Sequence, residues 1–244
     1  YVARNEIITG IERLRQSVAM KSGFIDLGDA YDRLCFLLIG IGDEGTREAL
    51  EAANKRLPDH PKLHIYQQVM RSMDPDSLVR GAANARLTDV SQLASGNRVI
   101  IAQAFHNAGD GHYRKLRIEA AIEAYERALR SDPERISSRI NLGWALLTAD
   151  RPGAAIEQYE LVLARGPHSI AQFNIALCLL SDGAYDDART AYKQAFERHG
   201  VSEAERLGVA GHLELLSSKG SHTSVAREIY RTYWSADQPM IPGS

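Results

Sequence analysis

Residues 136–167 contain two runs of apolar positions at helical spacing. Ile140, Leu142 and Leu146 belong to the first run, and the stretch 150–153, which contains charged residues, Pro and Gly, interrupts the pattern before it resumes. Apolar spacing of this kind predicts two amphipathic helices joined by a tight turn, that is, a helical hairpin. One such hairpin cannot bury its apolar face alone, so neighbouring hairpins must stack to form a core.

The same pattern occurs three times along the chain, at steps of 34 and 33 residues. Three sets of equivalent positions define the period, namely Asn107, Asn141 and Asn174; Ala121, Ala155 and Ala188; and Tyr125, Tyr159 and Tyr192. A fixed period of this length indicates a repeated supersecondary unit rather than three unrelated hairpins.

Small residues stand where the two helices of a hairpin must approach each other. Gly143 lies in the expected first helix and Ala155 in the second, while Tyr159 supplies the bulk that fills the space beside them. Pro167 follows the second helix, and it is predicted to end that helix because a proline has no amide hydrogen.

The spacing of Leu142-Gly143, Ala155, Tyr159 and Pro167 resembles the tetratricopeptide repeat. The resemblance covers three units, residues 102–133, 136–167 and 169–200, of which the third has Ala176 for the glycine and Gly200 for the proline. It implies an all-α fold, an α-solenoid in which about six antiparallel helical hairpins stack into a right-handed superhelix.

Outside the three regular units the pattern is weaker. Residues 3–20 are expected to form a single helix, and residues 62–73 and 76–87 another short hairpin. The predicted organisation is divergent hairpins in 1–100, three regular repeats in 101–200, and a degenerate or capping hairpin with a C-terminal tail in 201–244.

Composition removes several classes of partner. The chain has 244 residues with a formal net charge of −2, which lacks the basic field that nonspecific nucleic-acid binding requires. Its longest apolar stretch, residues 34–41, is too short to cross a bilayer, so no membrane span is predicted. The sequence gives no indication of localisation.

Candidate catalytic and metal-binding residues do not form a motif. Cys35 and Cys178 stand singly on apolar faces, and His106, Asp110 and His112 lack a further ligand at a familiar metal-site spacing. No nucleophile with a base and no phosphate-binding loop is found. We therefore predict no metal, no cofactor and no enzymatic activity.

In proteins with this repeat, the first helices of successive hairpins line a concave groove along which a partner peptide lies in extended form. A carboxamide carries both a donor and an acceptor, so a row of asparagines can hold a peptide backbone. The resemblance implies as peptide-binding residues Asn107, Asn141, Asn174, His106, Asp110, Ile140, Trp144, Phe173 and Leu177.

The side chains of this groove predict the chemistry of the partner. The first unit offers His106 and Asp110 whereas the others offer mainly apolar groups, so an apolar or mixed peptide fits better than an acidic one. Trp144 leaves two interpretations open: an anchor for the partner, or a side chain covered by residues 230–234 or by neighbouring helices.

Three functions remain as hypotheses. The first is a non-catalytic scaffold that binds a peptide segment of another protein in the groove. The second is a regulatory or substrate-docking region of a larger enzyme or membrane-associated assembly, since the chain begins at Tyr1 rather than Met. An intrinsic enzyme would need a catalytic cluster in residues 22–100, where none is found. Self-association through Tyr230, Tyr233 and Trp234 of the terminal hairpin is a further expectation.

Overall fold

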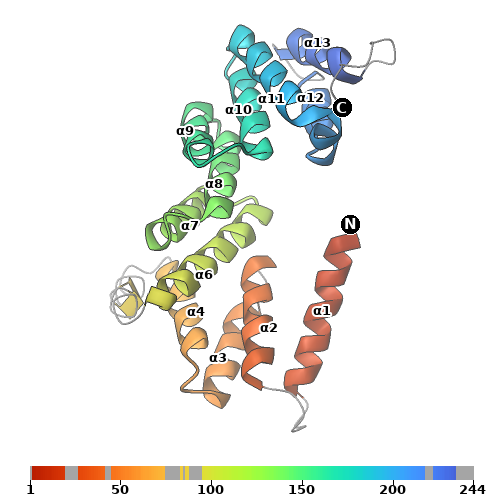
Figure 1. The fold of residues 1–244 in the computed structure, drawn as a ribbon. Helices are drawn as coiled ribbons and strands as arrows, with labels where there is room; N and C mark the ends of the chain where they lie inside the picture. The colour runs from red at the N-terminus through yellow and green to blue at the C-terminus, as the bar shows by residue number, and fades with distance from the viewer. Residues whose placement is uncertain are drawn as a thin grey trace. The chain divides into compact units, whose positions relative to one another are not determined.

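The computed structural model describes residues 2–19, 27–41, 45–74, 83–84, 86–87, 95–217 and 222–234, and no strand occurs in these ranges. The helices are α1 (Val2–Ala19), α2 (Leu27–Ile41), α3 (Thr46–Arg56), α4 (Pro61–Ser72), α6 (Ser95–Arg114), α7 (Ile118–Ser131), α8 (Ile136–Thr148), α9 (Pro152–Leu163), α10 (Ser169–Ser181), α11 (Tyr185–Arg206), α12 (Val209–Ser217) and α13 (Thr223–Trp234). Figure 1 shows these helices with the same labels.

The chain divides into two compact units, residues 1–138 (unit 1) and residues 139–244 (unit 2). In unit 1, α2 packs against α1, α3 and α6, and α6 pairs with α7 (Figure 1). The core of this unit includes Leu38, Leu63 and Val69, whose exposed fraction is 0%. The predicted domain boundaries at residues 100 and 200 stay predictions.

Unit 2 continues the pattern of successive antiparallel helices. In it α10 packs against α9 and α11, and α12 pairs with α13. Its core is rich in aromatic side chains: Phe173 meets Phe196 edge to face with ring centroids 5.1 Å apart, and Tyr233 stacks on Phe196 at 3.6 Å. The prediction of an all-α fold of stacked helical hairpins, an α-solenoid, is confirmed.

The close approach of the two helices of a hairpin rests on glycine, as predicted. A Cβ atom added at Gly143 would lie 2.6 Å from Cζ of Tyr159, and one added at Gly109 would lie 2.5 Å from Cε1 of Tyr125. Both tyrosines are buried, so their rings fill the space that the missing side chains leave. The third repeat has Ala176 at this position, beside the equally buried Tyr192.

The turn between the two helices of a hairpin has the same backbone conformation in all three regular repeats. Leu116, Asp150 and Gly183 have φ of 58°, 58° and 82°, in the left-handed region. In the first repeat, the N–H of Leu116 donates to the carbonyl oxygen of Tyr113, and the N–H of Arg117 donates to the carbonyl oxygen of His112. The equivalent pairs recur in the other two repeats. This is the Schellman motif, in which a left-handed residue ends the helix and satisfies its last carbonyls.

The end of the second helix differs from its prediction. α9 ends at Leu163, before Pro167, so the proline does not end the helix. Gly166, immediately before Pro167, has a φ of 139°, a backbone conformation that glycine adopts readily. In the third repeat Gly200, with φ of 77° and ψ of 168°, interrupts α11 where the family pattern has its proline.

The divergent half agrees with the sequence in part. α1 confirms the single helix expected over residues 3–20, and α4 confirms the helix expected over residues 62–73. Most of residues 76–87, the expected partner helix of α4, lies outside the described residues.

Candidate functional site

Unit 2 contains a pocket of about 260 Å³ bounded by α8, α10 and α12. Six of the nine sequence-predicted site residues line it, and they come from two consecutive first helices, as the repeat pattern implies. The lining residues are Ile140, Asn141, Trp144, Ile170, Phe173, Asn174, Leu177, Tyr192, Leu207, Val209 and His212.

The α8 wall of the pocket follows from helical spacing. Ile140 and Trp144 are four residues apart and share one face of the helix, while Leu142 and Ala145 on the other side are buried. Trp144 is half-buried, with its ring centroid 5.0 Å from that of His212 in α12. Between the two interpretations of Trp144, the structure therefore gives a mixed result: a neighbouring helix covers part of the ring, and the ring also lines the pocket.

The α10 side forms the floor. Phe173 and Leu177 are 2% and 6% exposed, and Phe173 belongs to the core of unit 2 through its contact with Phe196. These two residues reach the pocket from beneath instead of projecting from an open surface. Their contribution to binding would be apolar contact at the bottom of the pocket.

The three repeated asparagines have different surroundings. Asn174 is 9% exposed, and its Nδ2 donates to the hydroxyl of Tyr159 at 3.2 Å. Asn107, in unit 1, is 5% exposed; its Nδ2 donates to the carbonyl oxygen of Phe36 at 3.4 Å, and its Oδ1 accepts from Gln103 at 2.7 Å. Asn141 is half-buried and lines the pocket. Asn107 and Asn174 therefore use their carboxamides within the fold.

His106 and Asp110 lie in unit 1, in a polar cluster around α6. Nδ1 of His106 lies 3.0 Å from Oγ of Ser138. Nε2 of His106 lies 3.8 Å from Oδ2 of Asp110. The other carboxylate oxygen of Asp110, Oδ1, accepts a 2.7 Å hydrogen bond from the hydroxyl of Tyr125. Burial lowers the pKa of His106. The order serine, histidine, aspartate resembles a nucleophilic triad, but Ser138 has no exposed surface for a substrate to reach. The cluster therefore connects α6 to its neighbours.

The third side of the pocket was missed from the sequence. Leu207, the residue that follows α11, and Val209 and His212 of α12 form it, in a segment predicted only as a capping hairpin. The signal was present, because one further step of 33 residues from Asn174 reaches residue 207. Burial lowers the pKa of His212, so its ring lines the pocket in the neutral form at pH 7.

The remaining candidate groups do not form a site. Burial raises the pKa of the thiols of Cys35 and Cys178 to about 12, which keeps both protonated. Among the described residues, no three His, Cys, Asp or Glu side chains gather as a metal centre would require. None of the described helices has the length and apolarity needed to cross a membrane. Tyr230, Tyr233 and Trp234 pack in part against the core of unit 2, and self-association through them stays a prediction.

Known proteins share the repeat pattern of this chain. A family model described as "Tetratricopeptide repeat" matches residues 106–169 and 140–200. The chain is similar to tetratricopeptide repeat protein 21B of Homo sapiens, with 30% identity over 117 residues, 48% of this chain and 9% of that protein. It is also similar to superkiller protein 3 of Saccharomyces cerevisiae, with 26% identity over 106 residues, 43% of this chain and 7% of that protein. The matched region thus spans less than a tenth of either relative.

Among solved structures, the chain is similar to a thermophilic TPR protein of Thermus thermophilus. The match has 20% identity and a TM-score of 0.36, and it covers 76% of this chain and 98% of that one.

Proposed function

This chain is a tetratricopeptide repeat protein, and from that premise we propose that it is a non-catalytic module that binds a peptide segment of a partner protein in the pocket between α8, α10 and α12. Repeats of this family are generally protein–protein interaction modules. The observation that supports this site most directly is that six residues from equivalent faces of two first helices line one pocket.

The chemistry of the pocket defines what the partner must present. No Lys, Arg, Asp or Glu is among its described lining residues, and its walls are mainly aliphatic and aromatic. An uncharged apolar side chain of the partner fits such a pocket, and burying one contributes about 1.5–3 kcal/mol. Asn141, at the pocket, carries a donor and an acceptor that suit the N–H and C=O groups of an extended backbone.

The experiment compares variants with the unchanged protein against one pool of ligands. A phage-displayed library of random linear peptides is selected on the 244-residue chain, and the affinities of the enriched peptides are measured. Trp144→Ala should cost about 2 kcal/mol of binding free energy, since buried aromatic anchors dominate such interfaces. Asn141→Ala should cost about 1 kcal/mol, the net contribution of one hydrogen bond.

Leu161→Ala is the matched control, because Leu161 is a large apolar residue of unit 2 that is 49% exposed on α9 and outside the pocket. Its affinity should stay within about 0.5 kcal/mol of the unchanged protein. Circular dichroism at 222 nm checks that each variant keeps its helices. Selected peptides that lack a shared apolar residue, or that bind Trp144→Ala as well as the unchanged protein, would show that the pocket is not the binding site.

A further inference from the structure

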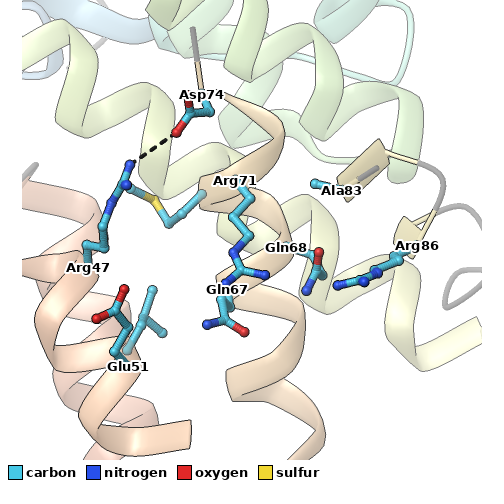
Figure 2. Close-up of a pocket in the computed structure, with 10 residues that line it drawn as sticks. Arg47, Glu51, Gln67, Gln68, Arg71, Asp74, Ala83 and Arg86 are labelled. Atoms are coloured by element: carbon cyan, nitrogen blue, oxygen red, sulfur yellow. Dashed lines mark hydrogen bonds and ion pairs between the residues drawn. The ribbon is translucent and has the colours of Figure 1, made fainter. Parts of the chain in front are cut away.

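Unit 1 contains a second pocket, of about 410 Å³, whose chemistry differs from that of the first. It lies along α3 and α4, and residues 83 and 86 also contribute to its lining. Figure 2 shows the side chains around it. The lining residues are Arg47, Leu50, Glu51, Gln67, Gln68, Met70, Arg71, Asp74, Ala83 and Arg86.

Gln68 has a feature that the fold does not explain. Its side chain lines the pocket and the residue is only 8% exposed, yet its Oε1 is buried with no hydrogen-bond partner. Leaving a buried acceptor unpaired costs about 1–3 kcal/mol, so native structures rarely do so without a reason. A ligand with an N–H group at this position would supply the missing donor.

The charged residues of the pocket are not balanced among themselves. Arg47 pairs with Asp74 at 3.2 Å, an ion pair drawn in Figure 2. Among the described residues, Arg71 and Arg86 take part in no ion pair, and both are exposed. With that pair set aside, the described lining residues leave two arginines and Glu51, a formal charge of +2 − 1 = +1. One carboxylate would balance this charge.

We propose that this pocket binds an acidic segment of a protein partner through an Asp or Glu side chain. The carboxylate lies against Arg71 and Arg86, whose guanidinium groups match its planar geometry. Oε1 of Gln68 is buried in the free protein, so its carboxamide turns toward the pocket and accepts a hydrogen bond from a neighbouring backbone N–H of the segment. The aliphatic part of the acidic side chain packs on Leu50 and Met70.

This site is independent of the proposed function, because its described lining residues belong to unit 1 and those of the first pocket belong to unit 2. A phosphate ligand fits less well, since a dianion would exceed the available positive charge and meet Glu51. The two pockets together divide recognition into an apolar site and an acidic-segment site on one chain.

The test is an NMR titration of the 244-residue chain with four probes. The first is the peptide Ac-Ala-Ala-Glu-Ala-Ala-NH2, and the second is the same peptide with Gln in place of Glu. N-acetylglutamate represents a free carboxylate, and inorganic phosphate represents another anion. We expect the Glu peptide to shift the amide signals of α3 and α4, with a Kd at least about tenfold below that of the Gln peptide, the equivalent of about 1.4 kcal/mol.

Variants assign the contacts. Arg71→Gln and Arg86→Gln should each weaken the Glu peptide by about tenfold or more. Arg33→Gln, at an exposed arginine of α2 outside the pocket, should leave it unchanged. Gln68→Leu should weaken the peptide while raising the melting temperature of the free protein, because it removes an unpaired buried acceptor.

Several results would overturn the proposal. Equal affinity for the Glu and Gln peptides would remove the role of the carboxylate, and so would unchanged binding by Arg71→Gln and Arg86→Gln. N-acetylglutamate binding as tightly as the Glu peptide would assign the pocket to a small carboxylate instead of a protein segment. Preference for phosphate would assign it to another class of anion. A loss of stability in Gln68→Leu would show that Gln68 serves the fold.

Discussion

Leu116 combines an unfavourable backbone with an exposed apolar side chain. Its φ is 58°, and the residue is 81% exposed. The equivalent turn position of the third repeat holds Gly183, with φ of 82°. The turn requires the left-handed conformation because two hydrogen bonds to the end of α6 depend on it. Replacing Leu116 with glycine should therefore stabilise the protein.

The magnitude follows from three terms. A left-handed backbone costs an L-residue about 1–2 kcal/mol, and glycine removes this cost. Glycine gives back about 0.5–1 kcal/mol through the greater freedom of the unfolded chain. The side chain is about four-fifths exposed, so losing its remaining burial costs only about 0.3–0.6 kcal/mol. Leu116→Gly should raise the free energy of unfolding by about 0.3 kcal/mol.

Urea unfolding followed by circular dichroism at 222 nm measures the change, with one control at the same position and one in the equivalent turn of the third repeat. Leu116→Ala removes the side chain but keeps the Cβ atom, so the backbone strain should remain and the stability should fall by the lost burial alone, about 0.3–0.6 kcal/mol. Gly183→Ala introduces a Cβ at φ of 82° and should destabilise by about 1 kcal/mol. The reasoning is refuted if Leu116→Gly is no more stable than Leu116→Ala.

Three further predictions concern packing and charge. Gly143→Ala places a Cβ 2.6 Å from the buried Tyr159 ring, so it should lower the free energy of unfolding by about 1–3 kcal/mol; an unchanged melting temperature would contradict this. Tyr125→Phe removes the 2.7 Å hydrogen bond to Asp110 and should cost about 1–2 kcal/mol in urea unfolding, whereas a neutral effect would mean that the bond contributes nothing. Burial holds the pKa of His212 below its unfolded value, so its stability contribution is complete above about pH 6.5 and is lost as the pH falls below that value. Replacing it with Gln should flatten the loss of stability as the pH falls below about 6.5, and an unchanged slope would refute that assignment.

The repeat period predicted the part of the site that regular repeats form. Ile140 and Trp144 of α8 and Asn174 and Leu177 of α10 occupy equivalent faces, so identical hairpins had to bring them together. The sequence could not show how deeply each side chain is buried. Phe173 occupies a groove position of the repeat, yet its exposure depends on Phe196, a contact that periodicity does not specify.

The rest of the proposed binding surface lies where the repeat is degenerate. Val209 and His212 complete the first pocket from α12, which follows the further 33-residue step but lacks the Asn and Gly of the regular repeats. Likewise, Arg71 and Gln68 of the second pocket belong to a divergent hairpin with no motif of its own. Such sites depend on tertiary packing and on one unpaired atom, which only coordinates can reveal.

The position of Trp144 makes the first pocket optically observable. The chain has two tryptophans, and Trp144 borders the cavity while Trp234 stacks on Tyr230 in α13. A bound side chain would displace water from the Trp144 indole and move its fluorescence to shorter wavelength. With Trp234 replaced by Phe, that emission becomes a label-free signal of occupancy, and the neighbouring His212 would make it respond to acidification as well.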